Sequence, residues 1–175
     1  MPKFLKNERG ATLLEICLCL SLIIILNGVA PPQLQNFKSY FDSRSTQKSL
    51  LSFLGLARSR ALHRQQIVTL CPLAEGSRCI GQWSEQLAIF VDQNSNAVRD
   101  ANEELLSTWQ ELPSQANLTW TLDRRYIRFR PNGTTSATTG SLRYCLSDRD
   151  STHNFRIVVA RTGRTRVDRN SHGCS

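Results

Sequence analysis

An apolar stretch without charge dominates the start of the chain. Residues 16–26 read ICLCLSLIIIL, inside the longer stretch RGATLLEICLCLSLIIILNGVAPP at 9–32. As a helix, residues 11–30 would extend about 30 Å, close to the thickness of the hydrocarbon core of a bilayer. The pattern therefore predicts a transmembrane helix over 11–30. The basic leader MPKFLKNERG at 1–10 predicts a cytoplasmic N-terminus and an exported remainder.

The pattern becomes amphipathic after residue 30. Over 31–65, apolar residues recur at helical spacing with basic residues placed among them. The recurring apolar positions are Leu34, Phe37, Phe41, Leu51, Leu54, Ala61 and Leu62. We expect one continuous helix that leaves the membrane and packs on a globular domain.

The rest of the chain, residues 66–175, has a strand-like pattern. Short runs rich in β-forming residues are separated by clusters of Gly, Asn, Asp, Pro and Ser. The runs are IVTLC, LAIFV, LTWTL, YIRFR, SLRYCL and NFRIVVA, and PNGTTSATTGS at 131–141 suits a polar hairpin or loop. The sequence therefore predicts an α+β fold, with a long N-terminal helix packed on a mostly antiparallel β domain.

Positive charge is concentrated in the last third of the chain. The 175 residues carry a formal net charge of +8, and from Leu118 onward there are eleven Arg, no Lys and four Asp. Arg presents a planar fork that suits phosphate and can stack on bases, so this block favours nucleic acid as a partner. The alternative is that arginines along strand edges serve solubility and prevent unwanted strand pairing.

Six cysteines in an exported chain indicate disulfides. Cys17 and Cys19 fall in the apolar helix and suit small apolar fillers. Pairing the other four with their neighbours in sequence joins Cys71 to Cys79 and Cys145 to Cys174. A zinc site is the rival interpretation, but the spacing fits no familiar ligand set and contains no Cys-x-x-Cys.

One acidic segment is similar to a calcium-binding loop. In DQNSNAVRDANE the oxygen-bearing residues match positions 1, 3, 5, 9 and 12 of an EF-hand; they are Asp92, Asn94, Asn96, Asp100 and Glu103. The position that requires Gly holds Ala97, and a strand-like run precedes the loop. The alternative is a turn in which these side chains cap backbone amides.

Signals for catalysis are weak. His63, His153 and His172 are scattered, and the motifs of serine hydrolases, zinc proteases and P-loop proteins are absent from the sequence. We therefore expect a protein without enzymatic activity, cofactor or metal.

Glu15 is the unexpected residue of the apolar stretch, because a carboxylate in hydrocarbon costs a few kcal/mol. The basic leader ends at Gly10 and is followed by Ala11, Thr12, Leu13, Leu14 and Glu15. This arrangement resembles the class III leader of type IV pilins and pseudopilins. The resemblance implies cleavage after Gly10 by a prepilin peptidase and methylation of the new terminus at Ala11. It also implies that Glu15 pairs with the terminal amine of a neighbouring subunit during fibre assembly.

Two later segments extend the resemblance to minor pilins of the FimT/GspH type. The first is WSEQLAIFVDQNSNAVRDANEELL, and the second is ARTGRTRVDR, with Gly163, Arg164 and Arg166. The second matches the Gly-Arg-x-Arg motif of the FimT branch, which binds DNA during natural transformation. Gly163 would allow a tight turn that presents Arg164 and Arg166 at a loop tip, with Arg161 and Arg169 flanking the pair.

The resemblance implies a non-catalytic minor pilin that binds DNA non-specifically at a type IV pilus. Other pilins, the prepilin peptidase and the inner membrane would be its further partners. It would cross the bacterial inner membrane once, with a periplasmic globular domain, before joining a pilus at the cell surface. The alternative is a structural minor pilin or pseudopilin of the FimU or GspH kind, which primes assembly of a pilus or type II secretion pseudopilus without binding DNA.

Overall fold

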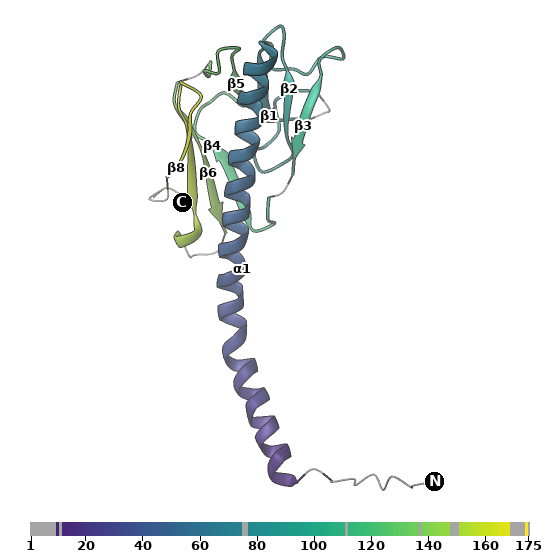
Figure 1. Ribbon diagram of the computed structural model, residues 1–175, viewed down its shortest axis with the longest axis vertical. Helices are drawn as coiled ribbons and strands as arrows, with labels where there is room; N and C mark the ends of the chain where they lie inside the picture. The colour runs from purple at the N-terminus through teal and green to yellow at the C-terminus, as the bar shows by residue number, and fades with distance from the viewer. Residues whose placement is uncertain are drawn as a thin grey trace, which may run out of the picture. The chain divides into compact units, whose positions relative to one another are not determined.

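The described part of the chain comprises residues 10, 12–74, 77–110, 112–136, 138–147, 151–168 and 174 of a computed structural model; for residues 25–36 and 151 only the backbone is described. The chain divides into two units, Met1–Ser39 and Tyr40–Ser175 (Figure 1). Helix α1 (Leu13–Arg64) contributes to both.

The start of α1 has a helix-capping pattern. Thr12 lies just before the helix, its hydroxyl accepts a hydrogen bond from the Glu15 N–H at 3.3 Å, and its carbonyl accepts one from the Ile16 N–H at 3.2 Å. A Thr followed three residues later by Glu is a capping box, in which the first turn's free N–H groups gain acceptors. The Thr12 hydroxyl therefore caps the helix start.

In the first unit, the apolar side chains described on α1 are solvent-exposed. Leu13, Leu14 and Ile24 are 81%, 69% and 72% exposed. Over the residues that the structure describes, no helix combines the length and the hydropathy of a membrane span. The transmembrane assignment of 11–30 stays a prediction.

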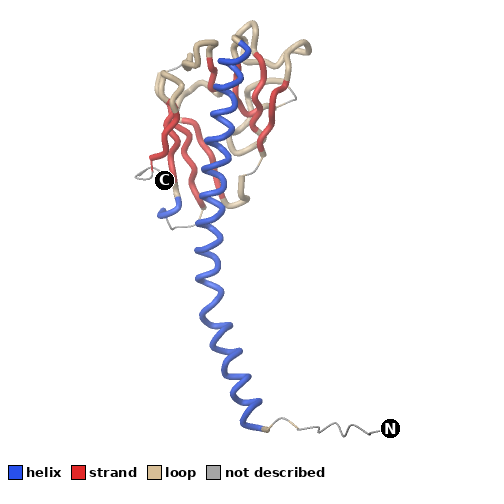
Figure 2. The backbone as a smooth tube through the Cα atoms, viewed as in Figure 1, coloured by secondary structure: helices blue, strands red, loops and turns tan. Residues whose placement is uncertain are grey.

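In the second unit, two antiparallel four-stranded sheets accompany α1 (Figures 1 and 2). The strand order is β3-β2-β1-β5 in the first sheet and β4-β6-β7-β8 in the second. The strands are β1 (Val68–Pro72), β2 (Leu87–Val91), β3 (Leu105–Trp109), β4 (Ala116–Trp120), β5 (Ile127–Phe129), β6 (Gly140–Leu146), β7 (Phe155–Val159) and β8 (Thr165–Asp168), with a 3-10 turn η1 (Ser151–His153) before β7.

One hydrophobic core joins α1 to both sheets. The helix contributes Leu50, Phe53, Leu54, Ala57 and Ala61, and alternate residues of the strands meet them; the largest of these are Leu70, Ile89, Phe129, Leu142, Tyr144 and Ile157. Because side chains alternate between the two faces of a strand, the intervening residues of the second sheet point away from this core. The predicted α+β fold is confirmed.

The structure joins the cysteines in the expected pairs. Cys71 is bonded to Cys79 and Cys145 to Cys174, with Cα–Cα distances of 5.5 and 5.7 Å. Cys17 and Cys19 are free and exposed. On the loop-entropy account, closing these loops stabilises the fold by about 2.6 and 3.6 kcal/mol.

Candidate nucleic-acid interface

The turn between β7 and β8 carries the Gly-Arg-x-Arg segment. The Gly163 N–H donates to the Ala160 carbonyl at 2.8 Å, and the Ala160 N–H donates to the Arg164 carbonyl at 2.9 Å. Gly163 has a φ of +75°, a left-handed conformation that suits glycine. It is buried, whereas Arg161 and Arg164 are exposed. The structure thus places a tight turn at Gly163.

Arg166 does not lie at the loop tip, as the sequence analysis expected. It lies on β8 opposite Val158 of β7, because the chain resumes strand pairing directly after the turn. Residues 164, 166 and 168 alternate with the half-buried Thr165 and Val167, and Val167 packs against the core. Arg164 and Arg166 are both exposed and share the outer face of the sheet. Arg169 falls outside the described residues.

Further arginines lie on this outer face. Arg143 of β6 is directly opposite Arg156 of β7, which in turn is opposite Asp168 of β8. Arg156 forms an ion pair with Asp168. Among the described residues, no carboxylate pairs with Arg143, Arg164 or Arg166. Arg143 and Arg156 are directly opposed like charges, but Asp168 offsets one of them, so these three side chains leave a net charge of +1 on this face.

The turn is fixed by contacts from two other parts of the fold. Arg58 of α1 donates from Nε to the Gly133 carbonyl at 3.1 Å and from Nη2 to the Thr162 carbonyl at 3.2 Å. The Thr135 N–H donates to the Arg161 carbonyl at 2.9 Å. A loop held at its backbone in this way presents its side chains from a fixed position, which limits the entropy lost when a ligand binds.

The acidic loop after β2 is a capped turn. Asp92 is fully buried; its Oδ2 accepts hydrogen bonds from Thr69 Oγ1 at 2.6 Å and Arg128 Nη2 at 2.8 Å, and its Oδ1 accepts one from the Asn96 N–H at 3.1 Å. Glu103 accepts hydrogen bonds at both oxygens, from the N–H groups of Gln93 and Asp100.

These donors occupy the oxygens that a calcium ion would need. Asp100 likewise accepts from the side-chain amides of Asn94 and Asn96, at 2.7 and 3.2 Å. No group of three or more His, Cys, Asp or Glu suited to a metal is found within the described ranges. The structure supports the turn interpretation of this segment.

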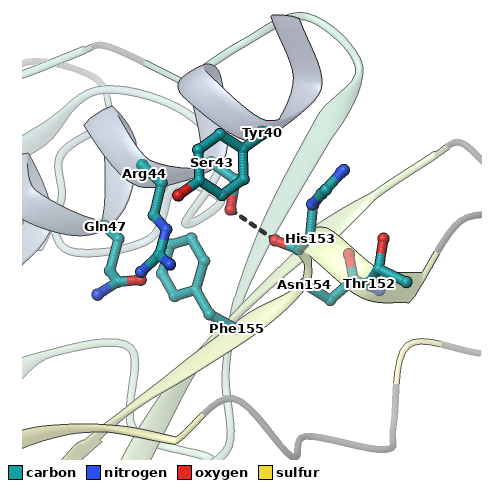
Figure 3. A pocket seen from close by; sticks show the side chains of 8 residues that line it. All are labelled: Tyr40, Ser43, Arg44, Gln47, Thr152, His153, Asn154 and Phe155. Carbon is teal, nitrogen blue, oxygen red and sulfur yellow. Dashed lines mark hydrogen bonds between the residues drawn. The ribbon is translucent and has the colours of Figure 1, made fainter. Parts of the chain in front are cut away.

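A shallow pocket lies between α1 and η1 (Figure 3). Ser43 Oγ donates to the His153 carbonyl at 2.5 Å, and the Arg44 guanidinium lies 5.2 Å from the centre of the Tyr40 ring. The volume is about 70 Å³, well below the several hundred Å³ of a typical small-molecule site. The sticks in Figure 3 bring His153 beside Tyr40, with ring centres 5.9 Å apart, but place no general acid or base against a nucleophile.

Other candidate residues from the sequence are placed as follows. Gly10 is exposed and Glu15 is exposed at the helix start, while Ala11 lies outside the described residues. Arg58, Arg143 and Arg156 were not predicted from the sequence as site residues. A strand-by-strand alternation of SLRYCL and NFRIVVA would have placed Arg143 and Arg156 on one face, but Arg58 gave no signal because its partners are 75 and 104 residues away.

Comparison with known proteins gives a family match and one curated relative. A family profile described as type II transport protein GspH matches residues 46–163, about two thirds of the chain. The pilin-like protein PilA1 of Thermus thermophilus is 34% identical over 102 residues, which are 58% of this chain. The chain spans 60% of the length of that relative.

Similar solved structures include a type IV minor pilin and a minor pseudopilin. The type IV minor pilin FimU of Pseudomonas aeruginosa is 16% identical with a TM-score of 0.60, over 75% of this chain and 92% of that one. The minor pseudopilin EpsH of the Vibrio cholerae type 2 secretion system is 14% identical with a TM-score of 0.52, over 75% and 99%. At these identities the likeness establishes the fold, and it agrees with the resemblance drawn from the leader and the later motifs.

Proposed function

The chain belongs to the GspH family of type II transport proteins, and from this premise we propose that it is a minor pilin that captures DNA. The pilin-like names of its relatives, PilA1, FimU and EpsH, support a place in a pilus or pseudopilus fibre beside other pilins. None of these names describes an enzyme, which is consistent with a non-catalytic role.

One observation supports DNA as the ligand. Arg164 and Arg166 are exposed on one face of the sheet, Arg164 at the end of the β7–β8 turn and Arg166 on β8. The backbone of the turn is anchored by Arg58 and Thr135. Guanidinium groups without a carboxylate partner are free to pair with phosphates. Contacts to the phosphate backbone carry no sequence information, so binding is expected to tolerate any duplex sequence and to weaken with salt. The cellular purpose would be DNA uptake in natural transformation.

The first prediction concerns this arginine pair. In the full chain, purified in a non-ionic detergent, Arg164→Gln with Arg166→Gln should lower the slope of log Kd against log salt by about 1.8, because each lost phosphate contact removes about 0.9. Fluorescence anisotropy with a labelled duplex measures both Kd and slope. The wild type should bind in the micromolar range or more weakly near physiological salt, equally for two unrelated duplexes.

A matched control removes the same charge elsewhere. Arg78 and Arg124 are exposed and make no described contact with the β7–β8 turn, so Arg78→Gln with Arg124→Gln should leave the slope almost unchanged. If the wild type fails to bind at low salt, or both double variants bind like it, the DNA role is wrong. The chain would then be better described as a structural minor pilin that primes fibre assembly, as its likeness to FimU and EpsH also allows.

A second prediction concerns the N-terminus. We propose that a prepilin peptidase cleaves after Gly10, that Ala11 is then methylated, that residues 11–30 anchor the chain in the inner membrane, and that Glu15 takes part in fibre assembly. In cells with the peptidase, mass spectrometry of the mature chain should find Ala11 first, and Gly10→Val should leave the leader attached because the peptidase requires a small residue there. A mature chain beginning near residue 30 would contradict this.

A further inference from the structure

A second turn repeats the geometry of the β7–β8 turn. In the segment after β5, the Gly133 N–H donates to the Arg130 carbonyl at 2.8 Å, and the Arg130 N–H donates to the Thr134 carbonyl at 2.8 Å. The corresponding bonds of the β7–β8 turn join Gly163 to Ala160 and Ala160 to Arg164. Both glycines have a φ of +75°. The two five-residue turns, 130–134 and 160–164, therefore have the same backbone pattern.

The two turns pack directly on each other. A Cβ placed on Gly163 would lie 1.9 Å from the Gly133 carbonyl oxygen, so the two backbones approach more closely than any side chain at position 163 would allow. Thr135, just after the first turn, is 4% exposed and donates its N–H to the Arg161 carbonyl in the second. The first turn extends from one sheet and the second from the other, so their contact joins the sheets at this end of the fold.

Arg58 holds both turns at once. Its guanidinium donates to one carbonyl of each turn, Gly133 and Thr162. Because both acceptors are neutral, the positive charge of Arg58 is not cancelled by these contacts. Lys could not reproduce this fork, since it carries its donors on a single nitrogen.

The paired turns carry positive charge without negative charge. The first turn adds Arg130, which is exposed, to the exposed Arg161 and Arg164 of the second. Neither RPNGT nor ARTGR contains Asp or Glu. In the described part of the chain, no ion pair involves these three arginines.

We infer that the two turns form a single DNA-binding unit, in which Arg130 supplies a further phosphate contact and Arg58 is the positioning residue that fixes the turns against each other. This inference rests on the proposed DNA function and extends its surface to a segment more than 25 residues earlier in the chain, outside the Gly-Arg-x-Arg motif. Phosphates of one duplex would then be contacted from two loops of fixed spacing.

The test of the surface uses three single variants of the detergent-purified full chain. Arg130→Gln should lower the slope of log Kd against log salt by about 0.9. If the variant and the wild type have equal Kd values at 1 M salt, this slope makes the variant bind roughly eightfold more weakly at 0.1 M salt. Arg130→Lys keeps the charge and should restore most of the slope. Arg124→Gln removes the same charge from an exposed site without described contact to either turn and should change the slope little.

The test of positioning uses a double-variant cycle. Arg58→Lys keeps the charge but loses the two-pronged hydrogen bonding of the guanidinium, so it should weaken DNA binding. In the Arg58→Lys background, Arg164→Gln should change log Kd by less than half of the change that it causes in the wild type. Thermal unfolding of each variant, followed by circular dichroism, separates this coupling from a general loss of the fold. Additive costs would show that Arg58 does not position the turn.

The outcomes separate this inference from the proposed function. If the Arg164 and Arg166 double variant loses slope while Arg130→Gln does not, DNA binds at the β7–β8 turn alone and the two-turn unit is wrong. If none of these variants differs from the wild type, or the wild type does not bind, the DNA function itself fails. Loss of slope in both turns with rescue by Arg130→Lys is the result expected.

Discussion

Asp92→Asn is expected to lower the free energy of unfolding by about 3–5 kcal/mol, the cost of removing one partner of a buried ion pair. Asp92 is fully buried, and the Arg128 side chain that pairs with it at 2.8 Å is only 11% exposed. The substitution leaves the guanidinium without a counter-charge, and the new amide cannot accept every hydrogen bond that the carboxylate accepts. Thr69 and the backbone amides of residues 96 and 97 share that carboxylate.

Thermal unfolding is the measurement. For a domain of this size the loss corresponds to a Tm lower by roughly 10–20 °C. Glu104→Gln is the matched control, because it removes a carboxylate from an arginine pair that lies at the surface, Arg64–Glu104. The hydrogen bond from Arg64 lowers the pKa of Glu104. Surface pairs contribute little, so the control should unfold near the wild-type temperature. Equal Tm values for both variants would contradict a structural role of the Asp92–Arg128 pair.

Gly163→Ala is expected to destabilise the fold by about 3 kcal/mol or more. A left-handed backbone costs an alanine about 1–2 kcal/mol, and the added methyl would lie 1.9 Å from the Gly133 carbonyl oxygen. The obstructing atom belongs to the backbone of Gly133 and cannot rotate away as a side chain could, so the two turns have to separate. A Tm lower by roughly 10 °C should accompany weaker DNA binding, since the same movement displaces Arg164.

Gly55→Ala provides the matched control, with the same chemical change at a different backbone. Gly55 lies on α1, is exposed, and a Cβ there would meet nothing within 4 Å. Alanine has the higher helix propensity, so this variant should gain about 0.8 kcal/mol. A Gly163→Ala variant as stable as wild type would show that the turns do not pack as described.

The sequence predicted the helix and six of the eight described strands. The second half of the helix was indicated by apolar residues at helical spacing, and the strands by short runs of β-forming residues between clusters of turn-forming residues. β3 and β8 were missed for a common reason, since both lie at sheet edges and carry polar residues. In β8 the core-facing positions hold only Thr165 and Val167, while Arg166 and Asp168 fill the other face. A four-residue strand of this composition has too few apolar residues to show a period of two.

For the candidate site, the sequence predicted the turn but not the contacts that hold it in place. Gly163 signalled the left-handed turn correctly, and the arginine-rich segment after it was identified from its motif. The contact with Gly133 and the bonds from Arg58 depend on chain segments brought together only by folding. Periodicity and local spacing carry no information about such pairs. Arg-Pro-Asn-Gly and Ala-Arg-Thr-Gly share only the final Gly, so the sequence gave no reason to compare the two turns.

The bond between Cys145 and Cys174 has a practical consequence for anyone who labels or purifies this protein. Cys145 alternates with core-facing Tyr144 and so lies on the sheet face that also carries Arg143. A tag, fluorophore or reporter fused behind Cys174 would emerge from that face and compete with any polyanion there, while a polyhistidine tail would add its own affinity.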